Sequence, residues 1–205
     1  MLDAQKESRI NFRRLAQRIR VPAGFILAPL LVIAAHPTPG SLIAGGVIAV
    51  MGLAIRGWAS GHLKKNEELT IWGPYAHTRN PLYLGTFIMS AGVVVSVASL
   101  WFGALFLGFY LFVYVPVMFA EAETVSKFFP KEYELYSRHV PLFMPRLIPY
   151  RAQSPDSERS PALPSSPGRR FDFEQYIRHR EYRAAIGLMA VYGLLIAKLY
   201  LFGDQ

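Results

Sequence analysis

Two long runs without a charged residue constrain what this chain can fold into. The first run extends from Val21 to Ile55 and the second from Pro81 to Ala120, which is 35 and 40 residues respectively. As one helix, each run would be roughly 52–60 Å long, against a hydrocarbon core of roughly 30 Å. Each run therefore predicts two membrane-crossing helices that fold back as a hairpin.

A turn is expected in the middle of each run. The first is His36-Pro37-Thr38-Pro39-Gly40, because two prolines and a glycine cannot continue a helix. The second is Ser99-Leu100-Trp101. A third apolar tract, from Ala184 to Phe202, predicts one more crossing. The sequence thus predicts an all-α integral membrane protein of about five transmembrane helices, two hairpins plus one C-terminal crossing.

Glycines and prolines predict further details of these helices. Gly45, Gly46 and Gly52 offer close contacts with a neighbouring helix. Pro116 should kink its helix, because the carbonyl that it frees needs another partner. Pro130 should break the amphipathic helix that is expected after the second run.

The basic residues gather on one predicted side of the membrane. Residues 1–20 hold six Lys and Arg, residues 56–81 hold four and residues 121–183 hold eleven, whereas Lys198 is alone on the opposite side. By the positive-inside rule these three segments are cytoplasmic. We therefore expect an active site that faces the cytoplasm and, in a prokaryote, a multi-pass protein of the inner (plasma) membrane.

The segments outside the crossings divide the chain. Apolar residues alternate with bases near the N-terminus, which predicts an interfacial helix whose partners are membrane lipids and not nucleic acid. Residues 151–183 are rich in Ser, Pro and Arg and predict a cytoplasmic linker with an interfacial segment. The expected units are 1–20, a membrane-embedded core over 21–150, the linker 151–183 and a C-terminal helix over 184–205. The oligomeric state stays open.

Several kinds of site are disfavoured by composition and spacing. The chain has no cysteine, which removes disulfides and thiolate catalysis. His and Glu do not occur at helical metal-ligand spacing, so no metal site is expected. No Gly-x-Ser-x-Gly elbow and no dinucleotide-binding fingerprint is present.

The stretch from Gly73 to Gly85 is unusually dense in polar and rigid residues. Gly73-Pro74 is a turn, Arg79 supplies one cation, and Pro81 suits the first turn of a helix. The free N–H groups of that helix would face back toward the loop and could hold a carboxylate or a polar cofactor. Because the second hairpin returns to the side from which it began, we expect Glu121 to lie beside Pro81.

Two motif blocks stand at either end of the second run. The first is Gly73-Pro74-Tyr75-x-x-x-Arg79-Asn80-Pro81-x-Tyr83-x-Gly85. The second begins with Glu121 and continues as Phe129-Pro130-x-x-Tyr133-x-x-Tyr136-x-x-x-Val140-Pro141. Over residues 56–149 the chain resembles the superfamily of isoprenylcysteine carboxyl methyltransferases and phospholipid methyltransferases, which are integral membrane enzymes.

The resemblance implies S-adenosylmethionine as cofactor and S-adenosylhomocysteine as its product. It implies a lipophilic acceptor reached from the bilayer, either an isoprenylcysteine-type carboxylate or a phospholipid-type amine. Carried over by position, the cofactor-binding residues would be Glu67, Glu68, Leu69, Thr70, Tyr75, Asn80, Pro81, Leu82, Tyr83 and Glu121.

The catalytic candidates follow from the chemistry of methyl transfer. Displacement at a sulfonium methyl needs a lone pair held in line behind the methyl group. A carboxylate acceptor needs no base, but an amine must lose a proton, which His62, His77 or Glu121 could accept. We expect His62 and Glu121 to be catalytic residues, together with Arg79, the cation of the first motif block.

Some positions depart from the family pattern and leave the acceptor open. Asn80 stands where eukaryotic members have His, and the usual pair of glutamates is reduced to Glu121-Ala122. Val117 stands near the place of an Arg that contacts substrate in carboxyl-methylating relatives. Two alternatives remain: an NADPH-dependent membrane sterol or isoprenoid reductase, whose members are usually longer, and a non-catalytic membrane scaffold.

Overall fold

The computed structural model describes residues 26–64, 68–151 and 170–202. These residues form helices and the loops between them, and none of them is in a strand. The predicted interfacial helix over 1–20, nearly all of the Ser/Pro/Arg-rich part of the linker and Glu67 lie outside the described residues.

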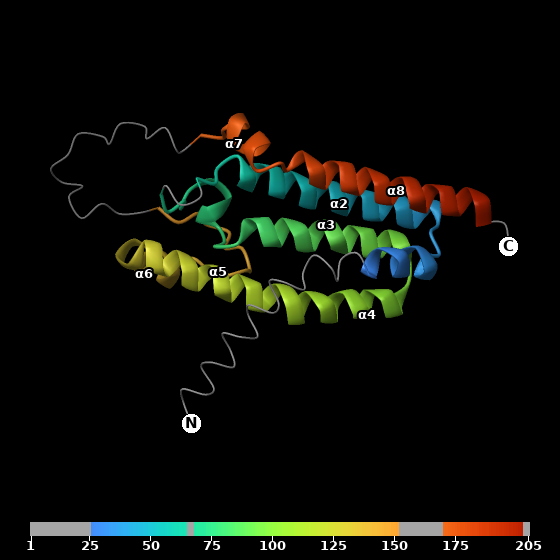
Figure 1. Cartoon of the computed structure of the whole chain (residues 1–205), viewed down its shortest axis with the longest axis horizontal. Helices are drawn as coiled ribbons and strands as arrows, with labels where there is room; N and C mark the ends of the chain where they lie inside the picture. The colour runs from blue at the N-terminus through green and yellow to red at the C-terminus, as the bar shows by residue number, and fades with distance from the viewer. Residues whose placement is uncertain (1–25, 65–67, 152–169, 203–205) are drawn as a thin grey trace, which may run out of the picture.

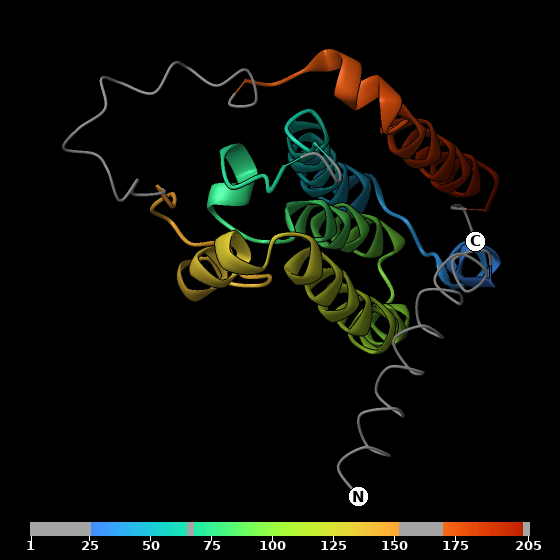
Figure 2. The ribbon, with the colours of Figure 1, turned by 60° about the vertical axis from the view of Figure 1, so that its left-hand side comes forward.

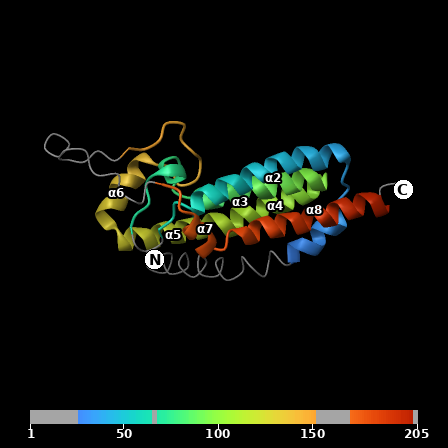
Figure 3. The ribbon, with the colours of Figure 1, turned by 90° about the horizontal axis from the view of Figure 1, so that it is seen from above.

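Long helices run side by side and form the body of the molecule (Figure 1). They are α2 (Pro39–Ser60), α3 (Pro81–Val97), α8 (Tyr182–Phe202), and a helix made of α4 (Leu100–Phe109), a π-helical turn (Tyr110–Tyr114) and α5 (Val115–Phe128). Shorter elements gather toward one end of this bundle, as Figure 2 also shows. They are the 3-10 helix η1 (Gly73–Ala76), α6 (Pro130–His139) and α7 (Phe173–Arg178). A helix over residues 26–34 lies toward the other end (Figure 3).

The lengths and composition of the helices fit a membrane protein. Within the described ranges, α2, residues 100–128 and α8 are long and apolar enough to cross a membrane, and α3 is a shorter apolar helix. Residues 26–34 are the described part of the first predicted crossing. The all-α membrane class is confirmed, and the number of five crossings stays a prediction.

Glycines let α2 and α3 approach closely. Of the three glycines for which close helix contacts were predicted, Gly45 and Gly52 face α3. A Cβ added at Gly52 would lie 2.6 Å from the carbonyl oxygen of Gly85, and one added at Gly45 would lie 2.8 Å from the backbone nitrogen of Ser96. Gly46 instead faces Tyr192 of α8. Small residues thus bring the first motif block against the end of α2.

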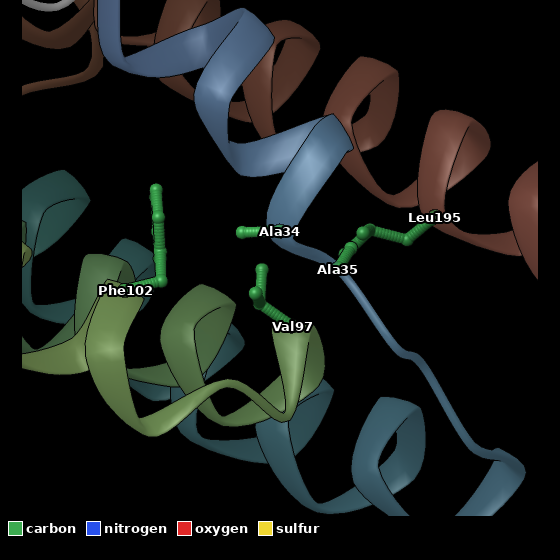
Figure 4. Packing of buried hydrophobic residues seen from close by; sticks show 5 residues of the cluster. All are labelled: Ala34, Ala35, Val97, Phe102 and Leu195. Carbon is green, nitrogen blue, oxygen red and sulfur yellow. The ribbon is translucent and has the colours of Figure 1, made fainter.

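The end of the bundle opposite α6 is held together by an apolar core. Its buried members come from residues 26–35, α3, α4 and α8, and they are Ala34, Ala35, Val97, Phe102 and Leu195 (Figure 4). The His36 N–H donates to the Val97 carbonyl at 2.8 Å. Lys198 Nζ donates to the Val32 carbonyl at 2.7 Å, so α8 is also tied to the end of the 26–34 helix.

The helix that contains Pro116 is irregular just before this residue, where the sequence predicted a kink. A proline cannot donate to the carbonyl four residues before it. Just before Pro116 the helix contains a π turn, in which the Val115 N–H donates to the Tyr110 carbonyl five residues earlier. The turn stacks the rings of Tyr110 and Tyr114, whose centroids are 4.9 Å apart. The predicted break at Pro130 is confirmed, since α5 ends at Phe128 and α6 begins at Pro130.

Candidate functional site

A cavity of about 940 Å³ lies at the end of the bundle that carries η1 and α6, and we call it the polar cavity because charged and hydroxyl-bearing side chains form part of its wall. This volume is within the usual range of small-molecule sites. The cavity is lined by ten predicted site residues: Glu68, Leu69, Thr70, Tyr75, Arg79, Asn80, Pro81, Leu82, Tyr83 and Glu121. It therefore brings both motif blocks to one place. Arg56, Thr86 and Tyr114 also line it, and the sequence did not single them out as site residues.

Glu121 lies beside the first motif block, as the hairpin predicted. The hydroxyl of Tyr83 donates a hydrogen bond of 2.6 Å to Glu121 Oε1. Glu123, two residues further along α5, forms an ion pair of 3.1 Å with Lys127 instead. Glu121 is exposed and Glu123 is half-buried, so cavity lining and not burial separates them: Glu123 does not line the cavity. The two glutamates thus face different surroundings, and Glu121 is the one that belongs to the cavity.

Arg79 is a fixed cation in the cavity wall. Its Nη1 donates to the hydroxyl of Tyr133 at 2.9 Å, and its guanidinium carbon lies 5.7 Å from the centroid of that ring. Its Nε is buried and has no hydrogen-bond partner within the described part of the chain. A buried donor of this kind favours an anionic ligand, because leaving it unsatisfied costs free energy.

The segment 141–150 lies against the residues that precede α3. Asn80 Nδ2 donates to the Leu142 carbonyl at 2.9 Å, and Thr78 Oγ1 donates to the Phe143 carbonyl at 2.9 Å. His77 Nδ1 is 2.7 Å from the Arg146 carbonyl oxygen. The amide of Asn80 and the ring of His77 therefore hold this segment in place, and His77 does not line the cavity.

Tyr75 presents a protonated phenol to the cavity. Burial raises its pKa far above the ordinary value, and the nearby Tyr136, Glu121 and Glu181 raise it further. Burial also raises the pKa of Tyr136, whose hydroxyl donates to the Tyr75 carbonyl at 2.7 Å. At neutral pH the Tyr75 phenol can therefore donate a hydrogen bond, but it cannot serve as a base.

His62, one of the predicted catalytic residues, is buried outside the cavity wall. Its Nδ1 is 2.9 Å from the Trp58 carbonyl oxygen, and its ring is 6.1 Å from that of Phe171. Gly73 covers the ring with φ +58°, and a Cβ added there would lie 2.7 Å from it. Gly73 thus supplies both a left-handed backbone and the space that His62 occupies. Glu67 lies outside the described residues.

A second cavity, of about 410 Å³, adjoins the polar one. The two share Ala28, Thr86 and Tyr114 as lining residues. The second cavity is lined by residues from 27–32, α3, α4, the π turn and α8, and its lining is mostly aliphatic and aromatic. Tyr114, in the π turn that precedes Pro116, thus lies where the two cavities meet.

Within the described residues, no group of three or more His, Asp and Glu side chains is arranged to hold a metal ion.

Comparison with known families matches a region that supplies much of the wall of both cavities. Residues 40–132 match the family described as phospholipid methyltransferase. This region runs from the start of α2 to the start of α6. The match agrees with the resemblance that the two motif blocks carry.

Two curated relatives align with more than half of the chain. The chain is 31% identical over 117 residues to the nickel-cobalt-cadmium resistance protein NccN of Alcaligenes xylosoxydans xylosoxydans, covering 56% of this chain and 54% of the relative. It is 30% identical over 144 residues to the cobalt-zinc-cadmium resistance protein CzcN of Cupriavidus metallidurans, covering 66% and 65%. The chain thus spans 54% and 65% of the lengths of these two relatives. No solved structure gives a significant match.

Proposed function

We propose, on the premise that residues 40–132 belong to the phospholipid methyltransferase family, that this chain transfers a methyl group from S-adenosylmethionine to a lipophilic acceptor. The observation that carries the proposal is the junction of the polar and apolar cavities at Ala28, Thr86 and Tyr114. A polar cofactor in the first and an acceptor in the second would meet there. The acceptor would reach its cavity from the bilayer.

The side chains of the polar cavity fit a zwitterionic cofactor that bears an aromatic base. Arg79, with its buried Nε lacking a partner among the described residues, would hold the carboxylate. Glu121 would accept hydrogen bonds from the ammonium group, and Tyr75 would donate from its protonated phenol. When bound, S-adenosylmethionine supplies an electrophilic methyl group on a sulfonium.

The chain itself would orient the acceptor and exclude water. The apolar cavity would take the hydrophobic part, and Thr86 and Tyr114 would guide the reacting atom toward the polar side. A carboxylate acceptor would need no base. For an amine, Glu121 is the candidate base, because it lines the polar cavity while His62 and His77 do not.

The polar cavity is proposed to face the cytoplasm. It lies at the end of the bundle where the described basic residues gather, and Lys198 lies near the other end. The positive-inside rule supports this orientation. In a prokaryote the protein would then lie in the inner membrane.

A role in metal resistance is the second candidate, supported by the names of the two relatives. Growth of a deletion strain of the source organism on graded cobalt, nickel and cadmium tests it. Complementation by the parent but not by Glu121→Gln would connect the phenotype to the polar cavity. Unchanged tolerance in the deletion strain would exclude this role.

Incubation with labelled S-adenosylmethionine and a lipid extract tests the enzymatic proposal. We expect label in an organic-soluble product whose identity names the acceptor. Binding of S-adenosylhomocysteine, with NADPH as the matched comparison, separates a methyltransferase from a reductase. Binding of NADPH alone would favour the reductase, and binding of neither would favour the scaffold.

A further inference from the structure

Arg56 stands in the wall of the polar cavity, at the place where the apolar cavity begins. Its Nη1 donates to Thr86 Oγ1, and Thr86 lines both cavities. Gly85, the last residue of the first motif block, makes room for this side chain, since a Cβ there would lie 2.7 Å from Arg56 Cγ. The close packing of α2 on α3 therefore carries a guanidinium to the junction.

Glu181 holds this guanidinium from a distant part of the chain. Arg56 Nε donates to Glu181 Oε2 at 3.1 Å, and Nη2 donates to Oε1 at 2.9 Å and to Oε2 at 2.8 Å. Glu181 lies near the end of the 151–183 segment, beyond the residues that match the family. One turn later, Ala184 of α8 lines the apolar cavity. The C-terminal segment thus supplies both an anion at the junction and part of the cavity wall.

We propose that Arg56 binds the anionic part of the acceptor's headgroup, a phosphate or carboxylate, and that Glu181 is an internal anion competing for the same guanidinium. The assignment rests on the proposed function, in that it takes the lipid in the apolar cavity to be the acceptor. A lipid with its chains among the apolar residues has its headgroup at Thr86, and so next to Arg56. A guanidinium is suited to this task because its planar fork of donors matches carboxylate and phosphate geometry.

The other cations of the polar cavity have different surroundings. Lys64 pairs with Glu68 at 3.1 Å on the loop that precedes η1, and Arg79 donates to Tyr133 of α6. Neither lines the apolar cavity or is bonded to a residue that does. Arg56 is the described cation that contacts the junction directly, through Thr86.

The alternative is that the Arg56–Glu181 ion pair only holds the start of α8 against α2, and this alternative predicts different results. A clamp is weakened whichever partner is changed, and neither change alters the choice of lipid. If Glu181 competes with the ligand, removing its charge strengthens binding of an anionic lipid, whereas removing the charge of Arg56 weakens it. The two substitutions then act in opposite directions.

The test uses the full chain in detergent and two short-chain lipids, dioctanoyl phosphatidic acid and its uncharged match, dioctanoylglycerol. Native mass spectrometry measures their relative affinities. We expect Arg56→Gln to reduce the preference for the phosphatidic acid roughly tenfold, the effect of losing a charge-assisted hydrogen bond, and Glu181→Gln to increase it severalfold. An unchanged preference in both variants, or a decrease in both, would overturn the proposal.

Three controls keep the outcome clear. The double variant Arg56→Gln/Glu181→Gln leaves neither charge without its partner, so it is expected to fold like the parent and to show the weak preference of Arg56→Gln. Inorganic phosphate should not displace the phosphatidic acid, and equally tight binding of phosphate alone would overturn a lipid site. Binding of S-adenosylhomocysteine is measured on the same samples, so failure of the methyltransferase proposal would be seen independently of lipid preference.

Discussion

Tyr83 and Glu121 are 38 residues apart in the sequence and are joined by a hydrogen bond of 2.6 Å. Tyr83 lies in the first turn of α3, and Glu121 lies on α5, which returns to the end of the bundle where α3 began. The bond connects the two motif blocks across the uncharged run between them. It places a carboxylate in the cavity that Arg79 and Tyr75 also line.

Glu121→Gln should weaken binding of S-adenosylhomocysteine roughly ten- to a hundredfold, because a charge-assisted hydrogen bond to the cofactor's ammonium group contributes roughly 1.5–3 kcal/mol. Glutamine keeps an oxygen that can accept from the Tyr83 hydroxyl, so the fold should persist. Titration calorimetry on the purified protein, with and without a chelator, measures the affinity and tests whether a metal contributes.

Glu123→Gln is the matched control for this change. Its carboxylate pairs with the exposed side chain of Lys127, and ion pairs of this kind contribute little to stability. Affinity for the cofactor should therefore stay at the parent's level. If Glu123→Gln lost affinity and Glu121→Gln did not, the register of the second motif block would be wrong by two residues.

Asn80→Ala should lower the stability of the protein by about 1 kcal/mol, because the Leu142 carbonyl loses its side-chain donor in a partly buried place. Thermal unfolding in detergent measures the loss. Ser137→Ala is the control, since the Ser137 hydroxyl bonds to a carbonyl of its own helix at the surface. Equal unfolding temperatures for the parent and Asn80→Ala would show that segment 141–150 does not depend on this bond.

Gly52→Ala should separate α2 from α3. The added methyl would lie 2.6 Å from the Gly85 carbonyl oxygen, which is backbone and cannot turn away. Overpacking of this kind costs about 1–3 kcal/mol. Gly193→Ala on α8 has open space around it and should leave the unfolding temperature unchanged or slightly higher. A neutral Gly52→Ala would mean that the two helices are not in close contact.

The sequence predicted those parts of the fold that depend on local chemistry. An uncharged run implies helices, Pro130 ends one, and a hairpin must return to its starting side, which is enough to place Glu121 near Tyr83. Gly45 and Gly52 were identified for the same reason, because residues without a side chain permit close helix contacts.

The remaining contacts leave no pattern in the sequence. Arg56 and Glu181 are 125 residues apart, and the charge of each is equally consistent with a solvated membrane boundary. Segment 141–150 is held largely through backbone carbonyls, which every residue has. The position of the His62 ring could not be predicted either, because the sequence around His62 is the same whether the ring packs under Gly73 or faces a cavity.

Alkaline pH should destabilise the protein through Tyr75. Its pKa is raised by burial, so the folded chain keeps a proton that the unfolded chain loses above the ordinary tyrosine value of 10.0. This contribution to stability is complete below that pH and is lost as the pH rises beyond it. Urea unfolding at several pH values from about 8 to 11 measures the loss. Tyr75→Phe should show a shallower decline, and an equal decline would contradict the assignment.

Labelling of introduced cysteines should show that the two ends of the bundle lie on opposite sides of the membrane. The chain has no cysteine of its own, so each introduced one is read alone. Gly40 is suited to the end that holds the 26–34 helix, because it is exposed and an added Cβ there meets nothing within 4 Å. Lys131, exposed in the first turn of α6, is suited to the end that holds the polar cavity.

The charge distribution determines the expected result. Twenty-one of the twenty-two Lys and Arg lie in segments assigned to one side, and positive charge is retained in the cytoplasm. An impermeant maleimide added outside intact cells should therefore label Gly40→Cys and not Lys131→Cys, and inverted vesicles should give the opposite result. Labelling of Gly40→Cys only from the cytoplasmic side would reverse the topology. The polar cavity would then open on the side opposite the cytoplasm. Because S-adenosylmethionine is made in the cytoplasm, it could not reach the cavity, and this result would contradict the methyltransferase proposal.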